Sequence, residues 1–477
     1  MASDAASTWR PFRVRFAYSA GNLPGQVISQ AFALWLIFFY APPDDEDAPT
    51  FLPTLGLPDL DLGLFAFPDE LAPRVLLGLT LTIAGIIEAF DDPILGYLTD
   101  RTKSRWGRRI PYVVLATPWW AFLFFLLFVP PFGDESIANL LWLIVVLEGF
   151  WLAGNVAGAP LEALMPHIAK SHEDRVSVAA MQLVFGILGA FLGLAVSGLL
   201  IDWVGFAGMA GILAVVGFVG RYASLAGCWD YARTDDEPST PGLVRSVRET
   251  LSNPHFIAFL PGFIFFRIAQ IMITAWIPFY VAAVLGDVEA FGFSGSEDEG
   301  VFTSAMTALI IVGIMAGIVI FAPLARRAGK ARAFRVSMLW GAATLFLLFF
   351  VGFVPGVPKL AQTAAVVLFA AFPMAGVFML PNILIADIVD YDAERTSTRR
   401  EGMFYGTQNL LEKSASAFAP LIFALVLLAG DSADDPLGIR LVGPVGGVLL
   451  LVGWFSFRRY ALYDDVRDAE PSEAAST

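Results

Sequence analysis

The chain has 477 residues, of which 57% are hydrophobic and 14% aromatic, and its formal net charge is −14 at pH 7. Such a composition, with repeated apolar runs of about 20 residues, is typical of a helical protein that crosses a membrane many times and excludes a soluble enzyme. The acidic balance argues against nucleic acid as a partner. A single cysteine excludes an intrachain disulfide, and three histidines without metal-ligand spacing argue against a zinc site.

Apolar segments long enough to cross a bilayer recur along the whole chain. We expect twelve of them, at about 18–40, 75–99, 111–130, 138–166, 177–201, 205–228, 255–285, 300–324, 333–354, 361–386, 402–430 and 438–457. A polar linker at 230–253 separates an N-terminal half of six spans, residues 1–229, from a C-terminal half at 254–460, and a polar tail occupies 461–477. The sequence therefore predicts an all-α polytopic membrane protein made of two six-helix halves.

The loops between these spans alternate in charge. Lys and Arg gather before the first span, around 101–109 and 326–335, in the linker and after the last span, whereas the loops at 42–73 and 287–299 are acidic. Because basic loops stay on the cytoplasmic side, both termini and the linker are predicted to be cytoplasmic. We expect a multi-pass protein of an inner or plasma membrane, in contact with the lipid bilayer and functional as a monomer.

The second span carries carboxylates in an apolar run. Glu88 and Asp92 are four residues apart and share one helical face, while Asp91 is turned about 100° away, towards a cap or a neighbouring helix. Each charge costs roughly 2.5–3.5 kcal/mol or more at the centre of a bilayer. A bound cation, Na⁺ as the metal, or protons taken up by the carboxylates would offset that cost. The alternative, a solvated helix end with surface acids, is disfavoured by the apolar residues on both sides.

Three segments carry a resemblance to a known family. They are DDPILGYLTDRTKSRWGRRIPYV at 91–113, APLEALMPHIAKSHEDRVS at 159–177 and ADIVDYDAERTSTRREGMFYGTQNLLEKSASAFA at 386–419. In this order they resemble the glycoside–pentoside–hexuronide:cation symporters, the melibiose-permease branch of the major facilitator superfamily. The resemblance implies the major facilitator fold and alternating access, with uptake of an organic solute driven by Na⁺ or H⁺ and with no cofactor.

The resemblance also implies a cation site. Glu88 and Asp92 fall where the family keeps its paired cation-binding carboxylates, and Lys413 falls on an eleventh-span lysine that acts as their counter-charge. A buried ammonium needs a carboxylate, which agrees with that role, whereas a lysine that snorkels to the helix end is the alternative. We place Asn155 with this cation-binding set.

The expected solute is a neutral or weakly charged glycoside. The family's first-span acid aligns with Gln26, its fourth-span acid with Gly158, and its fifth-span arginine falls near Gln182 and Leu183. Amides remain that could bind hydroxyl groups, at Asn22, Gln26, Asn155, Gln182, Gln408 and Asn409, although hydrogen bonds between helices are an equal alternative for each. Aromatic rings that could stack on a sugar are Trp276, Trp340 and Tyr405.

Glu162 and Arg267 are taken as the remaining charges inside the spans. Glu162 is expected either to join the cation or substrate site or to pair with a base on the cytoplasmic side. Arg267 is expected either to bind an anionic head group bidentately or to pair with an acid of another helix.

Cytoplasmic charges form a separate set. The resemblance implies a latch between the halves made of Asp100, Arg101, Arg105, Arg108 and Arg109, with Asp387, Asp390, Arg399 and Arg400 as its counterpart in the second half.

Three other functions stay open. The first-span stretch YSAGNLPGQV at 18–27 is similar to that of the sodium-dependent lysophosphatidylcholine transporters, so a lysolipid solute is the main alternative. A membrane enzyme is disfavoured because HExxH, GxSxG and a Cys/His cluster are absent. A sensor that does not transport is disfavoured by the intact cation-site residues.

Overall fold

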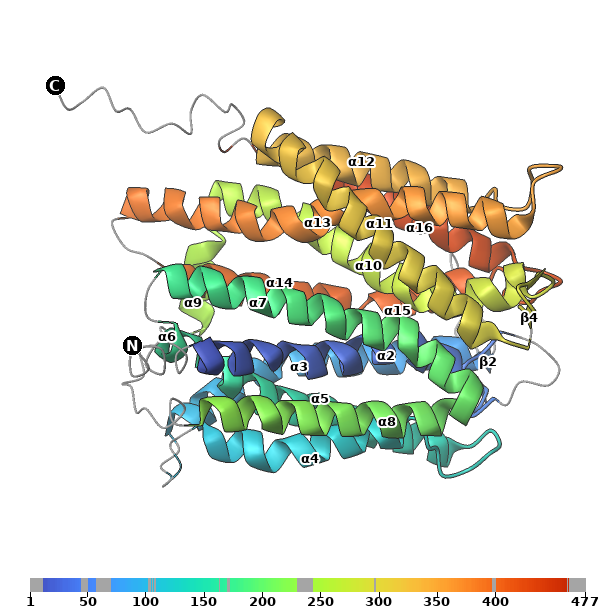
Figure 1. Ribbon diagram of the computed structural model, residues 1–477, viewed down its shortest axis with the longest axis horizontal. Coiled ribbons are helices and arrows are strands. Elements are labelled where there is room, and N and C mark those ends of the chain that lie inside the picture. Colours follow the sequence, from blue (N-terminus) through green and yellow to red (C-terminus); the bar gives the residue numbers. More distant parts are fainter. Residues whose placement is uncertain are drawn as a thin grey trace, which may run out of the picture. The chain divides into compact units, whose positions relative to one another are not determined.

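The computed structural model is almost entirely helical (Figure 1). It describes residues 12–43, 50–56, 70–101, 104, 106, 109–162, 164–169, 172–229, 243–295, 297–396, 400–460 and 462. The chain divides into two compact units. The first comprises Met1–Ser239 and Asp298–Ser304, and the second comprises Thr240–Glu297 and Ala305–Thr477.

The first unit is a bundle of long helices. A helical stretch from residue 12 leads into α2 (Asn22–Tyr40), and α3 (Pro73–Arg101), α4 (Ile110–Leu127), α5 (Ile137–Glu162), α6 (Met165–Ile168), α7 (His172–Phe191), a π-helical turn η1 (Leu192–Val196) and α8 (Ser197–Cys228) follow. Helix α4 packs on α5, and α2 packs on both α7 and α8. Within the predicted loop at 42–73, β1 (Leu55–Gly56) pairs antiparallel with β2 (Glu70–Leu71).

A glycine separates the predicted fifth and sixth spans. Helix α8 contains a break at Gly205, whose φ of 72° and ψ of 175° lie outside the helical region. Only glycine adopts such a conformation without strain, because any Cβ would clash with the backbone. The fifth span therefore runs through α7, η1 and the start of α8, and the sixth span is the part of α8 after Gly205.

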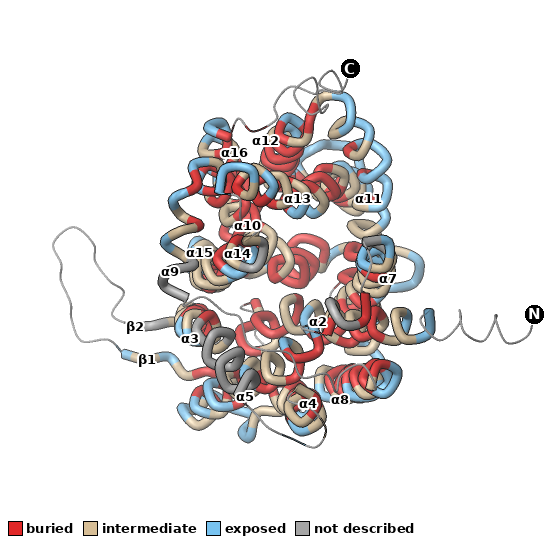
Figure 2. The backbone as a smooth tube through the Cα atoms, turned by 90° about the vertical axis from the view of Figure 1, so that its left-hand side faces the viewer, coloured by how far each residue is buried: buried red, intermediate tan, exposed pale blue. Residues whose placement is uncertain are grey.

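The second unit is built in a similar way. It contains α9 (Leu243–Thr250), α10 (Pro254–Leu285), most of α11 (Glu299–Ala328), α12 (Lys330–Leu348), α13 (Lys359–Thr396), α14 (Glu401–Ser416), α15 (Ala419–Leu427) and α16 (Leu437–Phe457), with a short hairpin of β3 (Glu289–Ala290) and β4 (Phe293–Ser294). Helix α10 packs on α16, and α12 packs on α13 and α16. Buried residues, red in Figure 2, follow the sides on which these helices meet. Helix α9 lies inside the predicted linker.

Helix α11 begins in the first unit and continues into the second. Asp202 of α8 caps its first turn, because Oδ1 accepts a hydrogen bond from the Gly300 amide at 3.1 Å and Oδ2 accepts one from Val301 at 2.7 Å. The helices touch at two glycines, since a Cβ on Gly198 would lie 2.4 Å from the carbonyl oxygen of Gly300. The start of α11 is thus held closely by α8.

The fold prediction is confirmed as an all-α, polytopic membrane protein. Among the described residues, ten helices are long and apolar enough to span a bilayer. One of them, Glu173–Cys228, has 56 residues and holds the fifth and sixth predicted spans, and α3 is not among the ten. The number twelve and the cytoplasmic location of the termini stay predictions.

Candidate functional site

Carboxylates gather between two neighbouring helices of the first unit. Glu88 and Asp91 are half-buried on α3, which packs against α5. Glu148 of α5 lies within electrostatic range of Asp91 and, more weakly, of Glu88. Asp92 is one residue further along α3, and its side chain lies outside the described part of the structure. Asp91 and Glu88 thus both act on an acid of the neighbouring helix, and the roles predicted for Glu88, Asp91 and Asp92 stay predictions.

Asn155 lies on the same helix as Glu148, seven residues and about two turns further on. Its Nδ2 is buried and has no hydrogen-bond partner in the part of the chain that the structure describes. An amide side chain offers an oxygen, the ligand atom that Na⁺ prefers, and an N–H donor for a bound solute. Within the described residues, no group of three His, Cys, Asp or Glu side chains is close enough to hold a metal ion.

The amides of the first span form hydrogen bonds between helices and within α2. Asn22 donates from Nδ2 to the backbone oxygen of Gln182 at 2.8 Å, and Gln26 accepts from Gln30 at 3.2 Å. The Tyr18 hydroxyl hydrogen-bonds the side chain of Gln182 as well as the backbone oxygen of Glu162, the latter at 3.0 Å. For Asn22 and Gln182 these contacts favour the alternative role, hydrogen bonding between helices.

The expectation that Glu162 and Arg267 are the remaining charges inside the spans is wrong. Glu148, Arg221 and Glu412 also lie within candidate spans. Glu162 is exposed at the end of α5, and Arg221 of α8 is buried within its electrostatic range. Each missed residue is a charge in an apolar run, so the rule that identified Glu88 would have found them too.

Arg267 in the second unit forms an ion pair. Its Nε donates to the carboxylate of Glu412, and its Nη1 donates to Oε1 of Gln270. The pair joins α10 to α14. Of the two roles expected for Arg267, the structure therefore shows the pairing with an acid of another helix. Lys413, the next residue after Glu412, is half-buried.

The two amides of α14 that are predicted to bind the solute differ in burial. Gln408 is buried, and its Oε1 has no hydrogen-bond partner among the residues described, whereas Asn409 is exposed. Gln408 is therefore placed to accept a hydrogen bond from a bound group, while Asn409 is not enclosed.

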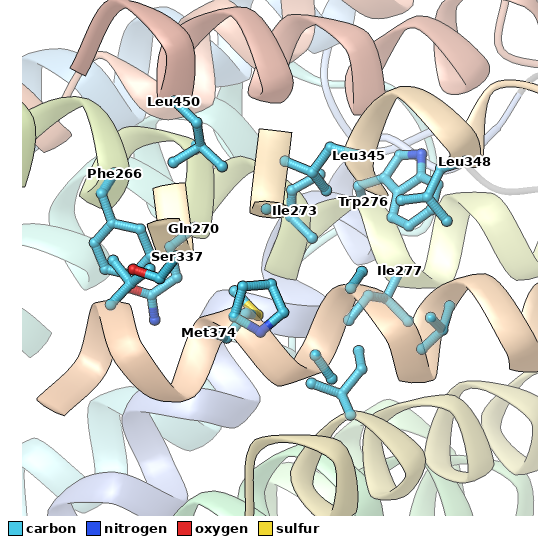
Figure 3. A pocket seen from close by; sticks show the side chains of 18 of the residues that line it. Phe266, Gln270, Ile273, Trp276, Ile277, Ser337, Leu345, Leu348, Met374 and Leu450 are labelled. Carbon is cyan, nitrogen blue, oxygen red and sulfur yellow. The ribbon is translucent and has the colours of Figure 1, made fainter. Parts of the chain in front are cut away.

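An apolar pocket lies inside the second unit (Figure 3). Its lining includes Phe266, Ile273, Trp276, Leu345 and Met374, and polar groups come from Gln270 and Ser337. The cavity of about 60 Å³ is far below the roughly 300–1,000 Å³ of small-molecule pockets. It does not accommodate a glycoside.

The aromatic residues predicted to stack on a sugar have other contacts. Trp276 is buried, and its Nε1 donates to the Ile439 carbonyl at 2.7 Å. The Trp340 ring packs on Phe369 at 5.1 Å between centroids, and Tyr405 is exposed.

Ion pairs join polar segments of the second unit that are predicted to be cytoplasmic. Lys330 binds Asp387 at 2.7 Å, and Arg400 binds Asp392 at 2.7 Å and Glu249 at 3.0 Å. Asp390 is exposed, and Arg109 occupies the N-cap position of α4. Of the other latch residues, Arg105, Arg108 and Arg399 lie outside the described residues, as do the side chains of Asp100 and Arg101. The latch between halves stays a prediction.

The sequence profile of the MFS/sugar transport protein family matches residues 71–438. The chain belongs to this family. It is 24% identical over 502 residues to an uncharacterized symporter of Synechocystis sp., with 88% of this chain and 86% of the relative covered. It is 21% identical over 436 residues to the isoprimeverose transporter of Lactiplantibacillus pentosus, with 88% and 81% covered. The chain is a secondary transporter rather than an enzyme, as expected.

Two further likenesses bear on the solute and on the fold. A sodium-dependent lysophosphatidylcholine symporter of Danio rerio is 30% identical over 112 residues, which cover 23% of this chain and 21% of the relative. The crystal structure of the nucleoside transporter NupG superposes with a TM-score of 0.62 at 12% identity, covering 94% of this chain and 98% of that one. The latter likeness concerns the fold alone, which is that of the major facilitator transporters.

Proposed function

We propose that the chain couples the downhill entry of Na⁺ or H⁺ to the uptake of a glycoside-type solute by alternating access. The observation that carries the proposal is the gathering of Glu88, Asp91 and Glu148 between two apolar helices. Carboxylates of like charge inside a membrane repel one another, and a cation that binds among them removes that repulsion. A symporter needs such a site, whereas a passive carrier does not.

Glu88 and Asp92 bind the cation in this proposal, with Glu148 contributing charge from α5. Lys413 balances the carboxylates when the cation site is empty. The isoprimeverose transporter among the relatives supports a glycoside as the solute. The exposed amide of Asn409 does not take part. Asn155 Nδ2 and Gln408 Oε1, which have no partner among the residues that the structure describes, are suited to hydroxyl groups.

Transport by purified protein in liposomes tests this function. With isoprimeverose as the first solute, an inward Na⁺ or H⁺ gradient should drive accumulation above equilibrium. Asp92→Asn should abolish accumulation because the site loses a charge, while exchange of solute across the membrane persists. Asp134→Asn, an exposed loop acid, is the matched control and should transport normally. Gradient-driven accumulation at the normal level in Asp92→Asn would contradict the assignment.

A lysolipid is the second candidate solute. It is supported by the 112-residue similarity to the lysophosphatidylcholine symporter. Sodium-driven uptake of lysophosphatidylcholine, with no uptake of any glycoside, would favour it.

A further inference from the structure

Arg221 of α8 is a buried cation that has no salt bridge to any residue the structure describes. Its side chain is 7% exposed. Among the described residues it forms no ion pair, and its Nε has no hydrogen-bond partner. Glu162 acts on it only as a more distant charge. A buried arginine is normally paired, because an uncompensated charge in a membrane is costly.

Other arginines of the spans are satisfied within the protein. Arg267 is paired with Glu412, and Arg440 of α16 donates to the carbonyl oxygens of Phe349 and Val351 at 3.0 and 2.7 Å. Arg440 also stacks on a ring, as Arg221 does. Among the described residues, Arg221 thus differs from Arg267 and Arg440 in having no acceptor for its guanidinium.

Two glycines leave space beside the terminal nitrogens of Arg221. A Cβ on Gly25 of α2 would lie 3.8 Å from one Nη, and a Cβ on Gly158 of α5 would lie 3.7 Å from the other. Among the described residues, neither added Cβ would meet any other heavy atom within 4 Å. The guanidinium thus ends beside two positions without side chains, on α2 and α5, and the space at these two positions is called the gap below.

The guanidinium of Arg221 also stacks on an indole ring. Trp120 of α4 is 4% exposed, and the Arg221 guanidinium carbon lies 4.7 Å from its ring centroid. Glycines hold the ring closely, because a Cβ on Gly154 would lie 3.1 Å from it and one on Gly217 would lie 3.3 Å from it. Stacking on an aromatic face leaves the in-plane donors of a guanidinium free to bind a ligand.

We propose that Arg221 binds an anionic group of the transported solute, a carboxylate or a phosphate, in the gap beside Gly25 and Gly158. A planar guanidinium donates two parallel hydrogen bonds to such a group, which supplies the missing counter-charge. The inference rests on the proposed transport function and narrows its solute, because a neutral glycoside would leave Arg221 uncompensated. It replaces Arg267 as the candidate anion-binding residue.

Binding to the purified full chain, measured by thermal stabilisation, tests the inference. Methyl glucuronide and methyl glucoside are matched probes that differ by the carboxylate, and lysophosphatidylcholine supplies a phosphate. The protein should bind at least one anionic probe about tenfold or more tightly than the neutral glycoside, since a hydrogen bond to a charged group is worth roughly 1.5–3 kcal/mol. Arg221→Gln should remove this preference, Arg221→Lys should keep part of it, and Arg440→Gln should leave it intact.

A second pair of variants acts on the gap instead of the charge. Gly158→Ala adds only a Cβ at ordinary contact distance and should retain binding. Gly158→Leu should fill the gap and weaken binding of the anionic probe about tenfold or more. This is the effect of losing a hydrogen bond between the anion and Arg221, which contributes roughly 1.5–3 kcal/mol. This pair keeps the test decisive if Arg221→Gln fails to fold.

The outcomes separate this inference from the function on which it rests. Equal binding of glucuronide and glucoside, or a preference that survives Arg221→Gln, overturns the inference while a glycoside symporter stands. Binding of lysophosphatidylcholine alone, lost in Arg221→Gln, supports the anion site and overturns the glycoside. If none of the three probes binds, the anion site is overturned, and isoprimeverose uptake still decides the function.

Discussion

Glu148 is a half-buried acid in the middle of a span, close to two other acids. Its neighbours Asp91 and Glu88 come from α3, so the negative charge is shared between two helices. Charge shared in this way attracts a cation without requiring each carboxylate to coordinate it. In the proposed cation site, whose ligands are on α3, an acid of α5 can therefore tune the affinity for the cation.

We expect Glu148→Gln to raise the cation concentration for half-maximal transport about tenfold, which corresponds to a loss of roughly 1.4 kcal/mol of charge attraction. Transport assays over a range of Na⁺ concentrations measure the change. Glu173→Gln removes an exposed acid of α7 and should leave the Na⁺ dependence unchanged. An unaltered dependence in Glu148→Gln would exclude it from the cation site.

The residues of the site differ in how far the sequence predicts them. Glu88 and Asp91 are identified because an acid in an apolar run is conspicuous, and Glu148 satisfies the same rule. The partner of Arg267 is not predictable in this way, because Glu412 is 145 residues away along the chain. The missing partner of Arg221 depends on how three other helices pack around it, so only the structure reveals it.

At the scale of elements, the ion pair between α10 and α14 is a fixed contact within the second unit. The Arg267 and Glu412 side chains are 31% and 16% exposed. Partial exposure weakens the pair by solvent screening, but removal of either partner leaves the other charge half-buried. The pair therefore contributes more to stability than one on the surface.

Arg267→Gln and Glu412→Gln should each lower the free energy of unfolding by about 1–3 kcal/mol, and the double variant by less than the sum. Thermal unfolding in detergent measures all three. The exposed pair of Lys359 and Asp287 is the control, and Lys359→Gln should cost no more than about 1 kcal/mol. Strictly additive effects would show that Arg267 and Glu412 are not coupled.

The predicted helices are mostly right in place and length, because apolar runs of membrane length are a strong signal. The fifth and sixth spans are an exception, since one helix assignment runs through them and only the backbone angles of Gly205 mark the turn. A glycine in an apolar run does not by itself indicate a break in the helix. The sequence therefore predicts the position of this turn only from the expected length of a membrane span.

At the scale of the whole molecule, the division into two units agrees with the polar linker but not in every residue. The division falls between Ser239 and Thr240, inside the predicted linker, and α9 belongs to the second unit. The transfer of Asp298–Ser304 to the first unit has no sequence signal. It follows from the packing of Gly198 on Gly300 and from the cap that Asp202 provides.

Asp202→Ala should weaken the attachment of α11, because the amides of Gly300 and Val301 lose their acceptors. Loss of a cap costs about 0.5–2 kcal/mol. In a Cys228→Ala background, the buried Ser304→Cys should react faster with a maleimide when Asp202→Ala is added, and Asp287→Ala should not change the rate. Unchanged labelling would show that the cap does not hold this segment.

We expect the sharing of α11 between the two units to affect the kinetics of transport. A continuous helix cannot lengthen without breaking its hydrogen bonds. Displacement of one unit from the other would therefore either bend α11 near Ser304 or release its first turn from Asp202. Both events are local and abrupt, and the second breaks two hydrogen bonds together. A fluorophore near Ser304 should therefore report a single exponential phase during turnover. Weakening of the cap by about 1 kcal/mol would change that rate constant about fivefold.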